Sequence, residues 1–133
     1  LVASLTRLVY EYFHWPFQPQ SLVQMLMKLN DPWILEGMFL LALVGAPVFE
    51  ETFFRGMLYP CLKKKLGFIH ALWINSALFA ASHFHLPSFL PLFLLALMFT
   101  LLYEWKRNLI VCILCHSAFN ALALCFLFFQ GKG

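Results

Sequence analysis

The chain has 133 residues, of which 62% are hydrophobic and 11% are charged, whereas ordinary soluble domains are about 45–50% hydrophobic and about 25% charged. This composition excludes a soluble enzyme, a disordered segment and a nucleic-acid-binding domain, although the formal net charge is +3. Residues 66–103 and 108–131 contain no Asp, Glu, Lys or Arg. At about 20 residues per membrane span, the first stretch holds two spans and the second holds one.

Residues 1–30 form a first region, in which we expect partial or amphipathic helices. Residues 1–15 are apolar but interrupted by two charges, so they form either the end of a span or an interfacial helix. Two prolines break this segment, and residues 21–30 then place apolar side chains on one face, as in a helix lying along a membrane surface. No basic segment followed by an apolar run and a cleavage site begins the chain, so we expect no signal peptide. Because the first residue is Leu1 and not Met, we expect further helices upstream.

Residues 31–133 are expected to form the functional core, with four membrane spans. Asp31-Pro32 is typical of a helix start, because Asp caps the first turn and proline is tolerated there. A basic segment ending at Gly67 separates the first two spans, and a proline stops the second. The predicted spans are 33–62, 68–85, 88–105 and 108–129. The predicted fold class is therefore all-α, a polytopic membrane helix bundle of four transmembrane helices preceded by partial or amphipathic helices.

The distribution of basic residues predicts the orientation of this bundle. With four spans, two basic residues, Lys28 and Lys132, lie on one side of the membrane. The other side carries Lys63, Lys64, Lys65, Lys106 and Arg107. Because basic residues in short loops favour the cytoplasmic side, we expect a multi-pass integral membrane protein whose 63–65 and 106–107 loops are cytoplasmic. Membrane lipid is then one partner of the chain, and nucleic acid is not.

Three charged residues, Glu50, Glu51 and Arg55, lie well inside the first predicted span. Each charge at the centre of a membrane helix costs about 2.5–3.5 kcal/mol on insertion scales. We therefore expect these residues to have a structural or functional role. Glu51 and Arg55 are four residues apart, which predicts an ion pair on one helical face. Glu50 is rotated by about 100° from Glu51 and has no local partner, and a carboxylate in that situation can serve as a general base.

Two other predicted spans carry polar residues of their own. The second contains His83, and the fourth contains His116 and Asn120, which are four residues apart and therefore share a face. Polar side chains in membrane helices normally turn inward and meet one another. Glu50 and the two histidines with Asn120 form a set suited to hydrolysis: a base for water, a partner to orient it, and two donors for a developing oxyanion.

Three motifs carry a resemblance to a known family. They are EETFFRG at residues 50–56, FAASH at 79–83 and HSAFN at 116–120. In this order, on separate apolar helices, they resemble the EExxxR, FxxxH and HxxxN motifs of the CPBP intramembrane proteases. That family includes the type II CAAX prenyl endopeptidases and the bacterial Abi proteins linked to bacteriocin self-immunity. The resemblance implies an intramembrane endopeptidase acting on a peptide or a lipidated protein.

The resemblance also implies a role for each motif residue. Glu50 and His83 would activate the water that attacks a peptide carbonyl. His116 and Asn120 would stabilise the tetrahedral oxyanion. Glu51 and Arg55 match the remaining positions of the first motif and would be a supporting pair, and Phe79 would be a packing residue one turn before His83.

Metal-dependent and glutamate-dependent chemistry are both attributed to this family. We expect no metal and no other cofactor, because HExxH is absent and Asn is an unusual zinc ligand. In the alternative, a zinc ion is held by Glu50, His83 and His116. Cys112 to His116 also spells C-x-x-C-H, the pattern for haem attachment, but a covalent haem has no room inside an uncharged span.

Other interpretations of the same residues stay open. Glu50, Glu51 and Arg55 taken alone fit a structural ion network that sets helix packing. The whole set also fits a non-proteolytic Abi-like membrane module that acts through partner helices. A third interpretation is an ion or proton pathway built on Glu50 and the histidines, although the amide of Asn120 does not relay protons readily.

Overall fold

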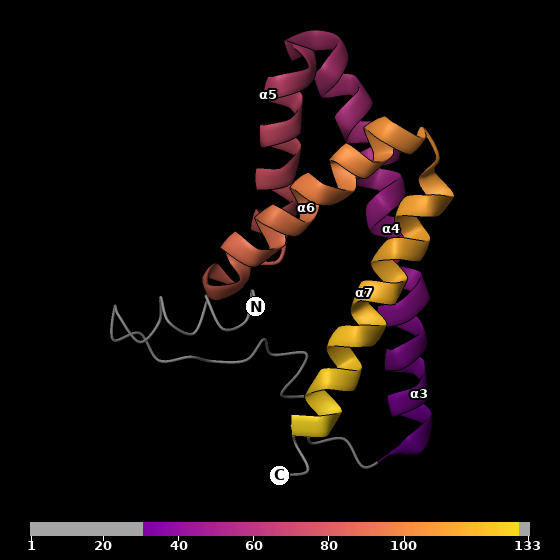
Figure 1. Cartoon of the computed structure of the whole chain (residues 1–133). Coiled ribbons are helices and arrows are strands. Elements are labelled where there is room, and N and C mark those ends of the chain that lie inside the picture. The colour runs from indigo at the N-terminus through magenta and orange to yellow at the C-terminus, as the bar shows by residue number, and fades with distance from the viewer. Residues whose placement is uncertain (1–30, 131–133) are drawn as a thin grey trace.

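The structure, a computed structural model, describes residues 31–130, with side chains described as far as residue 126 (Figure 1). The predicted helices of residues 1–30, Lys28 and Lys132 lie outside the described residues. The elements are helices throughout the described part. In order they are α3 (Pro32–Leu40), the π-helix η1 (Leu41–Gly45), α4 (Ala46–Glu51), the π-helix η2 (Thr52–Leu58), α5 (Tyr59–Ala81), α6 (Leu86–Lys106) and α7 (Leu109–Gln130).

The first helix begins as the sequence predicts. The Asp31 carboxylate accepts hydrogen bonds from the backbone N–H groups of Trp33 at 2.9 Å and Ile34 at 3.4 Å. Pro32 occupies the first helical position, where an N–H has no intrahelical partner to lose. From this cap, helical structure continues to Leu66 and resumes after Gly67 as far as Ala81.

Gly67 reverses the chain within this long helix. Its backbone dihedrals, φ 80° and ψ 172°, are not helical, and Figure 1 shows α5 turning back on itself. Three described helices are long and apolar enough to cross a membrane: Pro32–Ala81, Leu86–Lys106 and Leu109–Phe126. Gly67 divides the first of them into two parts, residues 32–66 and 68–81, which correspond to the first two predicted spans. The helices α6 and α7 correspond to the third and fourth predicted spans. The predicted helical membrane bundle is confirmed.

One predicted boundary is wrong. The second span was expected to reach residue 85, but α5 ends at Ala81 and His83 lies in the turn that follows. Phe84 takes a left-handed conformation with φ 49°, which a helix cannot accommodate. Pro87 then stands in the first turn of α6, where its missing N–H costs nothing. His83 is therefore placed by a turn and not by a helix.

The two basic segments lie at the same end of the bundle. The Glu104 carboxylate near the end of α6 accepts hydrogen bonds from Tyr59 at 2.8 Å, Lys63 at 2.7 Å and Arg107 at 3.0 Å. The bonds from Tyr59 and Lys63 join the start of α5 to the end of α6. One residue of each basic segment, Lys63 and Arg107, thus bonds to the same carboxylate.

Most large apolar side chains of the spans face outward. The small core joins Phe54 of η2, Phe79 of α5 and Ala96 of α6, with Leu58 and Leu92 packed against it. Exposed apolar side chains extend along every span and include Leu40, Phe49, Trp73, Met98, Leu114 and Leu122. A surface covered with apolar side chains is stable in contact with lipid and not with water. The chain is an integral membrane protein.

The reversal at Gly67 yields a test of the fold. Its dihedrals lie in a region that is essentially restricted to glycine, and a Cβ there would meet no atom within 4 Å. We therefore expect Gly67→Ala to lower the free energy of unfolding by about 1–3 kcal/mol through backbone strain alone. Unfolding with SDS in mixed micelles measures this change.

Gly37→Ala is the matched control, because Gly37 is inside α3 and a Cβ there also meets nothing within 4 Å. It should leave stability unchanged or raise it by about 0.5–1 kcal/mol, since Ala favours a helix over Gly. Equal stabilities of the two variants would contradict a reversal at Gly67.

Candidate active site

The two adjacent glutamates stand at the end of α4, a six-residue helix between two π-helical segments. Ala46 N–H donates to the Leu41 carbonyl and Tyr59 N–H to the Phe54 carbonyl, both across five residues. π-helical turns of this kind occur frequently at functional sites. The motif glutamates therefore belong to the most irregular part of the first span.

Prolines explain both π-helical segments. Pro47 stands two residues after the end of η1, and Pro60 stands two residues after the end of η2. A proline removes the i to i−4 hydrogen bond, and its ring clashes with the carbonyl four residues before it. A wider turn before each proline relieves that clash. The two prolines, at residues 47 and 60, are the sequence signal for these wider turns.

Glu51 is the centre of the buried polar cluster. Its side chain is 0% exposed, as is that of Arg55. Glu51 Oε1 accepts a hydrogen bond from Arg55 Nη1 at 2.9 Å and another from His116 Nδ1 at 2.8 Å. The ion pair between Glu51 and Arg55 predicted from their spacing is present. The bond from His116 joins the first helix to α7 across 65 residues.

Arg55 and Phe79 complete the support of this cluster. Arg55 Nη2 donates to the Ala96 carbonyl of α6 at 3.1 Å. Its guanidinium lies over two aromatic rings, 4.8 Å from the centroid of Phe79 and 5.5 Å from that of Phe99. The Phe79 ring also lies 5.0 Å from the ring of His83, so its predicted packing position next to His83 is observed.

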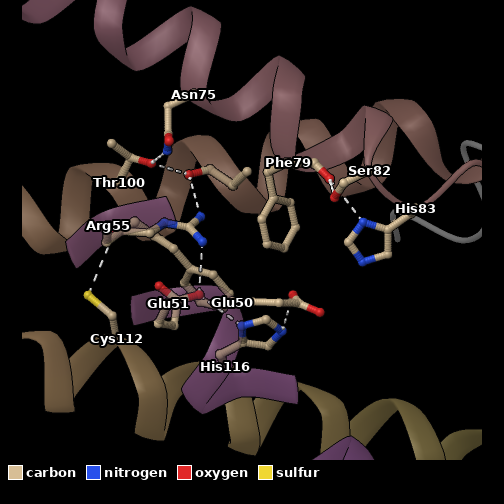
Figure 2. Close-up of polar contacts among 12 residues, drawn as sticks. Glu50, Glu51, Arg55, Asn75, Phe79, Ser82, His83, Thr100, Cys112 and His116 are labelled. Carbon is tan, nitrogen blue, oxygen red and sulfur yellow. Dashed lines mark hydrogen bonds and ion pairs between the residues drawn. The ribbon is translucent and has the colours of Figure 1, made fainter. Parts of the chain in front are cut away.

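Glu50 faces a different environment from its neighbour. Its side chain is 23% exposed, and its Oε2 atom lies 3.9 Å from Nε2 of His116. Within the described part of the chain, Oε2 is buried and has no hydrogen-bond partner. Figure 2 shows the Glu50 carboxylate between the rings of His116 and His83, and both histidines act on it electrostatically. The structure therefore brings the motif glutamate and the two motif histidines together.

Both histidines have one ring nitrogen committed to an acceptor. His83 Nδ1 lies 2.9 Å from the Phe79 carbonyl, and His116 Nδ1 lies 2.8 Å from the Glu51 carboxylate. A carbonyl and a carboxylate accept hydrogen bonds, so Nδ1 is the donor in each ring. The Nε2 atoms are then left to face the Glu50 side of the site.

Asn120 lies one turn beyond His116 on α7, but its hydrogen bond leads elsewhere. Its Nδ2 donates to the Ala42 carbonyl of η1 at 2.9 Å, which joins α7 to the first π-helical segment. A carboxamide has two N–H donors, so this bond leaves the second one.

Opposite charges face one another within the cluster. Glu51 pairs with Arg55, and Glu50 faces His116. Because isolated charges are expensive inside a membrane, these pairings lower the cost of burying the polar groups.

Among the described residues, no group of three His, Cys, Asp or Glu side chains is arranged to hold a metal ion. Cys112 donates to the Phe99 carbonyl at 3.8 Å. Cys115 is exposed, so the C-x-x-C-H residues do not converge on one site.

A comparison with protein families gives a match over most of the described chain. A family model described as type II CAAX prenyl endopeptidase Rce1-like matches residues 32–122, which are 91 of the 133 residues. The chain belongs to this family. The matched range includes all three motifs, so the resemblance predicted from them is confirmed. Comparisons with curated proteins and with solved structures gave no significant match.

Membership of the Rce1-like family makes the chain a membrane protein of a protease family, with its polar cluster inside the matched residues. Sequence reasoning missed several members of that cluster. Ala42 and Ala96 contribute backbone carbonyls, which no side-chain motif reports. Asn75 and Thr100 are buried polar residues on α5 and α6, and their presence inside predicted spans was a signal that could have found them.

In this Rce1-like chain, Arg55 offers a test of the buried pair. Arg55→Leu leaves the Glu51 carboxylate buried without its cation, and breaking a buried pair in this way costs about 3–5 kcal/mol. We expect that loss in the free energy of unfolding, measured with SDS in mixed micelles. The double variant Glu51→Gln with Arg55→Leu should recover part of it, because no uncompensated charge remains. A double variant less stable than Arg55→Leu would argue against the pairing.

Proposed function

We propose that the chain is an intramembrane endopeptidase in which Glu50, assisted by His83, activates a water molecule to hydrolyse a peptide bond. The observation that carries this proposal is the state of the Glu50 carboxylate. It lies beside two histidines with a buried oxygen that has no partner among the described residues. Glu51, one residue later, also has a buried oxygen, Oε2, without a partner among the described residues, but its Oε1 accepts from Arg55 and His116 and its side chain is 0% exposed. We therefore assign Glu50, whose side chain is 23% exposed, as the carboxylate that takes the proton.

In the proposed reaction, Glu50 acts first as a base and then as an acid. Glu50 removes a proton from water while Nε2 of His83 accepts a hydrogen bond that orients it. The water oxygen bonds to the peptide carbonyl carbon, and the carbonyl π electrons move to oxygen. When the tetrahedral intermediate collapses, the C–N bond breaks and Glu50 returns the proton to the leaving amine. The carbonyl forms again, and the products are a carboxylic acid and an amine, which exchange one proton to become a carboxylate and an ammonium.

His116 and Asn120 supply the oxyanion donors in this scheme. In the proposal, the protonated His116 ring donates from Nε2, and the Glu51 carboxylate stabilises that ring through Nδ1. Asn120 contributes the N–H that is not bonded to Ala42. Removing one such donor costs about 10²–10³ in kcat in well-studied hydrolases. Glu51, Arg55 and Phe79 support these groups and do not touch the substrate.

The substrate we propose is a membrane-associated peptide or a lipidated protein, in line with the prenyl endopeptidase family. We place the end of the bundle with Lys63–Lys65, Lys106 and Arg107 in the cytoplasm, because basic residues favour that side. No step of the mechanism requires a metal ion.

Replacing the base provides the main test. In the full chain reconstituted in liposomes, Glu50→Gln should lower kcat for a prenylated CAAX peptide by about 10²–10⁴-fold. Mass spectrometry of the products measures the loss. Stability should be retained, because Glu50 Oε2 makes no hydrogen bond to the described residues.

Glu36→Gln is the control for Glu50→Gln, since Glu36 is an exposed carboxylate on α3 and should leave kcat unchanged. Full activity in Glu50→Gln would overturn the mechanism. A wild-type chain that cleaves nothing would favour the Abi-like module, and proton-coupled flux in the same liposomes would favour the pathway interpretation.

The metal-free mechanism has its own test. Treatment with EDTA or 1,10-phenanthroline should leave the rate of peptide cleavage unchanged, because the protein groups alone supply base and oxyanion donors. A known zinc protease assayed in the same liposomes is the control for chelator access. Loss of activity with chelator and its return with zinc would instead support a site at Glu50, His83 and His116.

A further inference from the structure

Two polar residues deep in the bundle have no part in the mechanism above. Asn75 on α5 and Thr100 on α6 are both 0% exposed, in spans where polar side chains are costly. Asn75 Nδ2 donates to Thr100 Oγ1 at 3.3 Å. They could simply join two helices, but their hydrogen bonds continue beyond this pair.

The continuation leads to the catalytic cluster. Thr100 Oγ1 donates to the Ala96 carbonyl at 2.8 Å, and the same carbonyl accepts from Arg55 Nη2 at 3.1 Å. Arg55 Nη1 donates in turn to Glu51, which also accepts from His116. Figure 2 shows this line of contacts running from Asn75 to His116. A carbonyl oxygen thus lies between the Asn75–Thr100 pair and the residues that face Glu50.

Each bond in this line has one donor and one acceptor. A hydroxyl has one proton, and Thr100 uses it on Ala96 because Asn75 donates to its oxygen. Thr100 then occupies one side of the Ala96 carbonyl, and the guanidinium must approach from the other. Stacking on Phe79 and Phe99 sets the plane of the guanidinium, but it does not by itself set its rotation within that plane.

We propose that Asn75 and Thr100 are positioning residues that set the orientation of Arg55 and, through Arg55 and Glu51, that of the His116 ring. Neither residue touches the reacting atoms. A shift of about 1 Å in a group that positions catalytic residues can cost 10²-fold in rate. The pair therefore contributes to kcat without contributing to substrate binding.

The experiment removes the Thr100 hydroxyl without changing the size of the side chain. Thr100→Val is compared with Thr100→Ser, which keeps the hydroxyl, in the full chain. We expect kcat to fall about tenfold in Thr100→Val with KM unchanged. We expect Thr100→Ser to keep the kcat of the wild type. The kcat measurement rests on the proposed function. A second measurement, of the ¹⁵N NMR signals of the His116 ring in ¹⁵N-histidine-labelled protein, is independent of the proposed function.

Tyr59→Phe is the matched control for loss of a hydrogen bond between the same two helices. Tyr59 is buried on α5, four residues after Arg55, and donates to Glu104 of α6, so its bond lies outside the line of contacts from Asn75 to His116. It should reduce thermal stability about as much as Thr100→Val while leaving kcat and the His116 signals unchanged. Thr100→Val should displace the His116 signals, which are assigned by their loss in His116→Gln.

Specific outcomes would overturn the proposal. It fails if Thr100→Val leaves the His116 signals at their wild-type positions, or if Tyr59→Phe displaces them equally. Displaced signals in a chain that cleaves no peptide would support the positioning role while contradicting the proposed function. If Thr100→Val does not fold, Asn75→Leu decides by the same readouts. That change also removes the Asn75 Oδ1 atom, which is buried without a partner among the described residues.

Discussion

The buried carboxylate of Glu51 is the constraint on which the rest of the structure depends. A charge with no exposure in a membrane bundle must be paired and hydrogen-bonded, and Glu51 accepts from both Arg55 and His116. One bond is local to the first helix, whereas the other reaches α7. Arg55 extends the same contact to α6 through the Ala96 carbonyl. Three helices are thus held in register around one carboxylate, and their register determines where Glu50 and His116 meet.

Two prolines give this cluster its irregular backbone. Pro47 and Pro60 follow η1 and η2 at the same spacing, and between them α4 and η2 carry Glu50, Glu51 and Arg55. The wider turns also change which carbonyls are available to side chains. Ala42, inside η1, accepts from Asn120 of α7. The departure from regular helix therefore provides a second contact between the first helix and α7, on the other side of the two glutamates from Arg55.

The sequence predicted the membrane bundle and the residues of the polar cluster, because both follow from local pattern and from the high cost of charge in lipid. Asp31 as a cap, the reversal at Gly67 and the pair of Glu51 with Arg55 are all short-range features. The end of α5 before His83 was missed, since it depends on the left-handed Phe84 and not on apolar length. The bonds from Asn75 to Thr100 and from Asn120 to Ala42 join residues far apart in the chain, so spacing could not predict them.

The two adjacent glutamates lie in different environments. Glu51 receives two strong donors, and a carboxylate so occupied is a poor base. Without it, Arg55 would be a buried cation with no counter-charge. Glu50, rotated by about 100° around the helix, stays clear of Arg55 and reaches the partly exposed side next to His116. Consecutive positions on one helix thus separate a fully buried carboxylate, bonded to two donors, from a partly exposed one, and in the proposed mechanism the second is the base.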